Sequence, residues 1–171
     1  MSLKQEIDKY AEACNQCMAD DPGSINKHLD SCPSCKDYNN KIEELNEMVQ
    51  LLKDNAGKPP EERYNIIKNR IEGFLELNDM QRKDAVGSML DAMSELSEND
   101  RVTIVTTRMD ILMNMPREQR NILLETVRDI TPDWTQERAD MEMRAVNAGT
   151  QHLMPLKRAL ARRMFSKALE L

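Results

Sequence analysis

The sequence predicts an all-α protein, in which a small N-terminal helical zinc-binding domain precedes an array of helix pairs. Composition is the first observation, because only 4% of the 171 residues are aromatic and 32% are charged, whereas β-sheets favour aromatic and β-branched residues. The second is that all four cysteines lie between residues 14 and 35. The third is a stretch that repeats after 38 residues, which is the pattern of stacked structural units.

Three helical pieces are expected before residue 54. Apolar residues at helical spacing predict a helix over about residues 3–18, and Asp-Asp-Pro-Gly over residues 20–23 ends it. A short second helix then carries His28 and Cys32, which lie four residues apart and therefore on one face. Pro33 suits the first turn of a third helix that should extend to about Lys53.

The third helix carries an apolar stripe, Ile42, Leu45, Val49 and Leu52, at spacings of three and four. This stripe could contact a partner, a second copy or the rest of the chain. Residues 55–60, which join a glycine to two prolines between helical segments, predict a linker. We therefore expect one domain over residues 1–54 and another over residues 60–171.

The second domain contains the repeat. Residues 64–93 align with residues 102–131 without a gap, and each unit is expected to form two helices. Asn78 and Gln81 form a capping box at the turn of the first unit, and Pro116 suits a first helical turn in the second. A final helix should run from Pro155 to the C-terminus. Helix pairs of this kind stabilise one another by stacking.

Four arginines recur with the repeat, and recurrence at equivalent positions indicates a structural role. Pairing with a carboxylate such as Glu72 or Asp110 is the expected form of that role. The arginines are Arg70, Arg82, Arg108 and Arg120.

The cysteines form two Cys-x-x-Cys pairs separated by fourteen residues, a spacing that indicates a metal site. Zinc is the expected metal, because thiolates with or without imidazole suit its tetrahedral coordination. Buried thiols, a redox pair or an iron–sulfur cluster are the alternatives. Five side chains compete for four positions, so either the four cysteines bind, or His28, Cys32 and Cys35 bind with one upstream cysteine. The five candidates are Cys14, Cys17, His28, Cys32 and Cys35.

The segment H-L-D-S-C-P-S-C-K-D-Y, which contains His28, Cys32 and Cys35, resembles the signature of the zinc-binding anti-sigma domain family. The resemblance covers about residues 3–53. It implies that one upstream cysteine, Cys14 or Cys17, completes the zinc site and that the long helix helps to bind a sigma factor. The paired cysteine in C-N-Q-C departs from the family pattern, and the upstream ligand lies closer to His28 than expected. A spare thiol beside a zinc thiolate suggests a redox-sensing role as a further hypothesis.

These observations predict a regulatory zinc protein that acts by protein–protein interaction, with anti-sigma-like control of transcription. The alternative is a zinc-stapled helical adaptor without a role in transcription. No nucleophile motif, phosphate loop or paired-carboxylate signature is present, so we expect no enzyme activity. The net charge of −6 argues against nucleic acid as a partner. The absence of a signal peptide or long apolar run predicts a cytoplasmic protein with no membrane partner.

Overall fold

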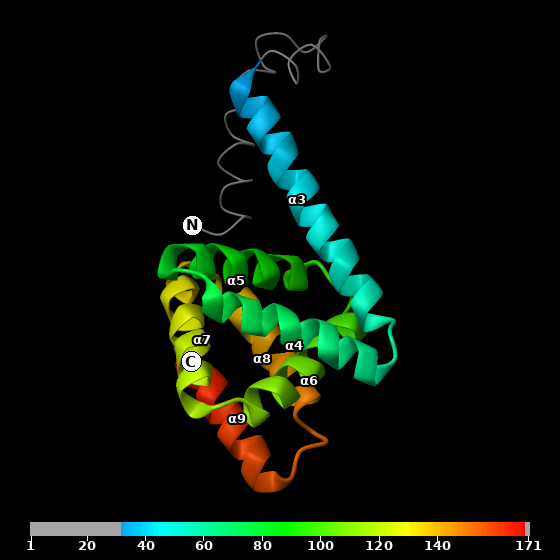
Figure 1. Ribbon diagram of the computed structural model, residues 1–171, viewed down its shortest axis with the longest axis vertical. Coiled ribbons are helices and arrows are strands. Elements are labelled where there is room, and N and C mark those ends of the chain that lie inside the picture. Colours follow the sequence, from blue (N-terminus) through cyan, green and yellow to red (C-terminus); the bar gives the residue numbers. More distant parts are fainter. Residues whose placement is uncertain (1–31, 170–171) are drawn as a thin grey trace.

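A computed structural model describes residues 32–169, and this part of the chain is helical without a β-strand (Figure 1). The expectation of an all-α fold is confirmed for these residues. The helices predicted over residues 3–18 and around His28 lie outside them. The elements are α3 (Pro33–Ala56), α4 (Pro60–Glu76), α5 (Asp79–Ser94), α6 (Glu98–Asn114), α7 (Arg117–Ile130), the 3-10 helix η1 (Thr131–Asp133), α8 (Gln136–Gly149) and α9 (Pro155–Ala168).

Six successive helices begin at a regular interval. The residue that caps each N-terminus lies 19 residues after the previous cap, from α4 through α9, which is half of the 38-residue offset seen in the sequence. The interval between the caps of α7 and α8 is also 19 residues, although η1 lies between them, because α7 has only 14 residues. The capping residues are Pro59, Asn78, Ser97, Pro116, Thr135 and Met154.

Three of these caps are polar side chains that accept a hydrogen bond from the third amide of their helix. Asn78 Oδ1 accepts from the amide of Gln81 at 3.0 Å, as expected for that turn. Ser97 and Thr135 do the same in α6 and α8. Pro116 is the N-cap of α7 and not a first-turn residue, because its extended backbone conformation lies outside the helix.

Arginine is the fourth residue after the cap in five of the six helices, and its guanidinium returns to the end of the preceding helix. There it donates hydrogen bonds to backbone carbonyls, which the end of a helix leaves without intrahelical partners. Arg101 makes three such bonds, to the carbonyls of Met93, Ser94 and Leu96. The other four are Arg63, Arg82, Arg120 and Arg158.

Replacing Arg101 with methionine should lower the free energy of unfolding by about 1.5 kcal/mol, because three carbonyls lose a charged donor while the apolar stem is kept. Chemical denaturation of the full chain measures this change. Arg144→Met is the control, since Arg144 is exposed on α8, and we expect a change within about 0.5 kcal/mol. Equal effects of the two substitutions would contradict a capping role for Arg101.

From α3 to α9, each helix packs most extensively against a helix two positions away in the chain. The arginines also take part in this packing. Arg63 Nε in α4 donates to Thr107 Oγ1 in α6 at 2.9 Å, and Arg82 Nε in α5 donates to Thr126 Oγ1 in α7 at 3.1 Å. Each of these two arginines therefore caps the helix before its own and also binds the helix two positions after its own.

The helix α3 belongs partly to this array. Its C-terminal half packs on α5 and α6, where Val49 and Leu52 join the same hydrophobic core as the later helices and Leu45 packs against it. Figure 1 shows the N-terminal half of α3 projecting beyond the array. Most of the apolar stripe therefore contacts the rest of this chain, and Ile42 lies beyond the packed region. Residues 57–59, expected as part of a linker, form the tight turn between α3 and α4.

The recurring arginines have the structural role expected, with different partners. Among the described residues Glu72 pairs with Lys68 and Asp110 pairs with His152, so neither carboxylate binds an arginine. Arg108 forms an ion pair with Glu142 on α8. The expected partners were wrong because packing between α6 and α8 brings together residues that are 34 positions apart in sequence.

Candidate functional site

Two of the five predicted metal ligands lie at the start of α3. Cys32 is the N-cap and Cys35 lies within the first turn, so the Cys-x-x-Cys pair spans a single helical turn. Cys35 is buried, with 1% of its surface exposed, and Cys32 is half-buried. The positive end of a helix dipole favours negative charge, such as that of a thiolate ligand, at this position. The local geometry therefore fits two adjacent metal ligands.

The other three candidates, Cys14, Cys17 and His28, lie outside the described residues. Within residues 32–169, no three histidine, cysteine, aspartate or glutamate side chains gather to hold a metal. The choice between the two predicted ligand sets therefore stays a prediction. The same part of the chain holds no helix long and apolar enough to span a membrane.

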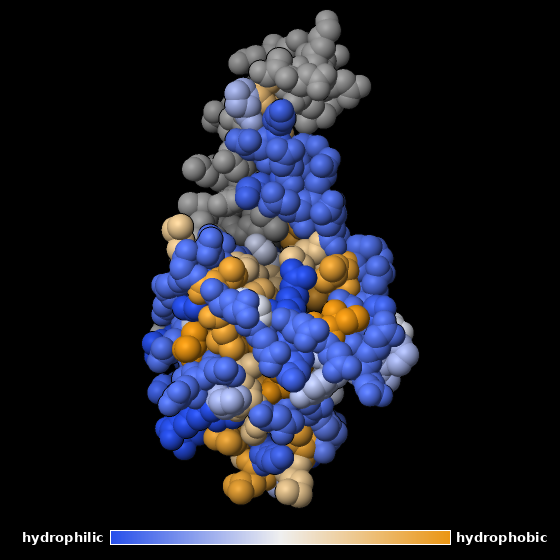
Figure 2. Space-filling view, in the orientation of Figure 1, coloured by the Kyte–Doolittle hydropathy of each residue, from blue (hydrophilic) through white to orange (hydrophobic). Residues whose placement is uncertain are grey.

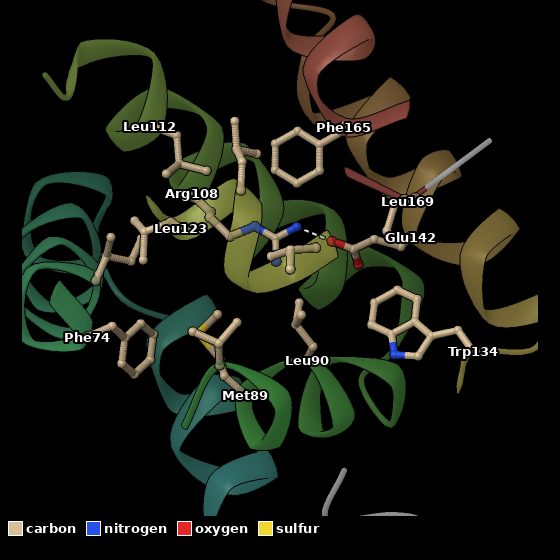
Figure 3. A pocket seen from close by; sticks show the side chains of 14 residues that line it. Phe74, Met89, Leu90, Arg108, Leu112, Leu123, Trp134, Glu142, Phe165 and Leu169 are labelled. Atoms are coloured by element: carbon tan, nitrogen blue, oxygen red, sulfur yellow. Dashed lines mark hydrogen bonds and ion pairs between the residues drawn. The ribbon is translucent and has the colours of Figure 1, made fainter. Parts of the chain in front are cut away.

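A second place of interest is a small cavity in the core of the array, which Figure 3 shows from close by. Its volume is about 40 Å³, and apolar side chains such as Phe74, Leu90 and Phe165 line most of it. Trp134, at the end of η1, also lines it. A water molecule needs roughly 10–15 Å³ and a substrate pocket several hundred. The cavity therefore has room for water and not for a sizeable ligand.

The polar groups in this cavity are Arg108 from α6 and Glu142 from α8, which point toward one another in Figure 3. Both side chains are more than nine-tenths buried and form an ion pair. Arg108 also lies over the ring of Phe165, 5.4 Å from its centroid, and donates to Met93 Sδ. Its Nε is buried and has no hydrogen-bond partner. One paired carboxylate and one arginine do not form an acid–base pair for catalysis, so this site is structural.

A second ion pair joins α8 to α5. Arg138 contacts Asp91 at 2.5 Å, and the Asp91 side chain has no exposed surface. The guanidinium of Arg138 also stacks over Trp134, 4.1 Å from the ring centroid. The two buried ion pairs together hold α8 against the preceding helices.

Two titratable groups with shifted pKa values, Asp79 and Lys83, lie at the surface of α5. Lys83 contacts Asp79 at 2.9 Å and Asp129 of α7 at 2.9 Å. The hydrogen bond from Lys83 lowers the pKa of Asp79, and the same bond raises the pKa of Lys83. Burial lowers the pKa of Arg70, which donates to Met48 Sδ of α3. These contacts join neighbouring helices, Lys83 joining α5 to α7 and Arg70 joining α4 to α3, so they indicate helix packing.

His152 lies on the surface between α8 and α9. Its Nε2 is 2.9 Å from Asp110 Oδ1 on α6, and the side chain is about half exposed. The contact anchors the loop that precedes α9. Sequence reasoning did not identify Arg63, Arg101 and Arg158 as capping residues. Their spacing of 19 or 38 residues from the recurring arginines, Arg82 and Arg120, is nevertheless visible in the sequence.

The described residues thus offer three features with chemical character: the cysteine pair at the start of α3, the buried ion pairs and the arginine caps. The last two serve the fold, and the first holds two of the five predicted metal ligands. Comparison with protein-family models, with curated proteins and with solved structures finds no match to this chain.

Proposed function

We propose that the protein is a regulatory zinc-binding protein that acts by protein–protein interaction. The observation that supports this most directly is the position of Cys32 and Cys35 on the first turn of α3, a helix whose other end is built into the core of the array. A metal bound there would hold the N-terminal segment at the projecting end of α3. His28 and one or both of Cys14 and Cys17 would supply the remaining ligands.

The role of the zinc is structural. A site closed by four protein ligands leaves no open position for a substrate, and its binding energy stabilises short segments that share little core. The partner implied by the resemblance of residues 3–53 is a sigma factor, bound by the N-terminal segment and the projecting half of α3. Control of transcription by occlusion of that partner is the resulting function.

Chelation of the metal should change the N-terminal segment and leave the array folded, because Val49 and Leu52 are held by the core of α4–α9 and not by the metal. Hydrogen–deuterium exchange measures this. We expect faster exchange in residues 3–40 after treatment with a chelator, with unchanged protection in α5–α8. Loss of protection throughout the array would contradict a local structural role, and an unchanged N-terminal segment would contradict a structural zinc.

A second candidate function is that of an adaptor whose array binds the partner. The exposed apolar side chains at the start of α9 favour it, because Leu156 is 83% and Met154 is 69% exposed. Figure 2 shows hydrophobic side chains at the end of the molecule where α9 begins. Exposed apolar side chains that gather in one place are typical of interaction surfaces.

Two full-length variants separate these functions. Cys32→Ser with Cys35→Ser removes the metal ligands of α3, and Leu156→Glu with Leu160→Glu changes the exposed start of α9. Binding to a purified sigma factor, measured by interferometry, should be lost in the cysteine variant and kept in the leucine variant. The opposite result would place the binding surface on the array, as in the second candidate function. A wild-type protein that binds no sigma factor would contradict anti-sigma-like control.

A further inference from the structure

A groove of about 310 Å³ lies between α7 and α9, the last pair of helices that pack two positions apart. Its apolar lining includes Leu124 from α7 and Met164 from α9, both half-buried. Three cationic side chains also line it, Arg117 and Arg128 from α7 and Lys167 from α9. The groove therefore combines an apolar surface with positive charge.

The side chains of these three cations make no hydrogen bond or ion pair with any of the described residues. Glu125 is the single acidic residue in the lining. The neighbouring helix pair, α5 and α7, differs in this respect, because the lysine between them, Lys83, forms ion pairs with both Asp79 and Asp129. Positive charge between α7 and α9 is therefore available to a ligand.

The whole of α9 strengthens this charge, since its fourteen residues include five basic and no acidic side chains while the chain carries a net charge of −6. Arg117 and Arg128 are eleven residues apart on α7, which is three helical turns or about 16 Å. Two cations at this separation on one helix face match two carboxylates that lie three turns apart on another helix.

We propose that the groove between α7 and α9 binds an acidic amphipathic helix of a protein partner. The partner helix places carboxylates against Arg117 and Arg128 and apolar side chains between them, against Leu124 and Met164. This is the helix-in-groove mode of recognition, in which apolar contact supplies affinity and charge supplies orientation. The site lies on the array and does not involve the metal, so this inference goes beyond the proposed function.

The test uses a fluorescein-labelled synthetic peptide, about 18 residues long to span the groove at 1.5 Å per residue. It carries glutamates eleven positions apart and leucines on the face between them. A control peptide has the same composition with the leucines spread around the helix. Fluorescence anisotropy with the full-length protein measures binding. We expect the first peptide to bind more tightly than the control, and added salt to weaken it because exposed charges are screened.

Two charge-reversed variants have equal net charge and locate the site. Arg117→Glu with Arg128→Glu should weaken binding at least tenfold, about 1.4 kcal/mol. Lys53→Glu with Arg144→Glu changes exposed side chains outside the groove and should leave the affinity within about twofold. Circular dichroism checks that both variants fold. If Arg117→Glu with Arg128→Glu does not fold, Arg128→Ala with Lys167→Ala takes its place. Cys32→Ser with Cys35→Ser should bind as the wild type does, which separates this inference from the zinc function.

Three results would overturn the proposal. One is a wild-type protein that fails to distinguish the two peptides. Another is an equal loss of affinity in the two charge-reversed variants, which would show attraction to net charge alone. The third is concentration-dependent dimerisation, abolished by Arg117→Glu with Arg128→Glu, that excludes the peptide; a second copy would then be the occupant of the groove.

Discussion

Replacing Glu142 with leucine should lower the free energy of unfolding by about 3 to 5 kcal/mol. The substitution fills the space with an apolar side chain and removes the partner of Arg108. Arg108 is 5% exposed and forms no other ion pair within residues 32–169. A buried guanidinium without its carboxylate retains the cost of desolvation and loses the attraction that offset it. Denaturant unfolding, followed by circular dichroism at constant pH, measures the change.

The matched control removes both charges. Arg108→Met with Glu142→Leu replaces the ion pair by side chains of similar size in a cavity that is otherwise mostly apolar. We expect this double variant to be as stable as the wild type or more stable by about 1 to 4 kcal/mol. A double variant as unstable as Glu142→Leu alone would contradict the explanation by an unpaired buried charge, and would indicate that packing of the two side chains dominates.

Gly149→Ala should destabilise the protein by about 2 to 3 kcal/mol, because the two helices α6 and α8 approach closely at this glycine. A β-carbon there would lie 3.0 Å from the backbone nitrogen of Thr106 and 3.2 Å from its Cα. These are backbone atoms of a neighbouring helix and not the end of a flexible side chain, so relief requires movement of α8 away from α6. Thermal unfolding measures the loss as a lower melting temperature.

Gly73→Ala is the control for the same chemical change. Gly73 is exposed on α4, and a β-carbon added there meets nothing within 4 Å. Alanine at such a helical position should stabilise the protein by about 0.5 to 1 kcal/mol. Opposite signs at the two glycines are the expected result. A neutral or stabilising effect of Gly149→Ala would show that α6 and α8 do not pack as closely as described.

Local chemistry made part of the fold predictable from the sequence. Asn78 and Gln81 mark a helix start through residues three positions apart, and the side chain of Asn78 makes the expected cap. The start of α3 at Pro33 and of α9 at Pro155 followed from the fixed backbone angle of proline. In each case the information lies within one helical turn.

Features that depend on packing were not predictable in this way. Arg108 reaches Glu142 only because α6 lies against α8, and nothing near Arg108 in sequence indicates a partner 34 residues away. The sequence also did not reveal that α3 joins the core of the array, because an apolar stripe does not identify the surface that covers it. The candidate metal site depends on Cys14, Cys17 and His28, which lie outside the described residues, so its ligand set remains a prediction from spacing and resemblance.

Metal content of the natively purified full-length protein tests the central claim most directly. Elemental analysis by mass spectrometry should find one zinc per chain in the wild type. Cys32→Ser with Cys35→Ser should abolish zinc binding, since these residues belong to both candidate ligand sets. Cys14→Ser, Cys17→Ser and His28→Ala then identify which side chain is spare. A wild-type protein with fully reduced thiols that binds no zinc, even after incubation with excess metal, would contradict the account.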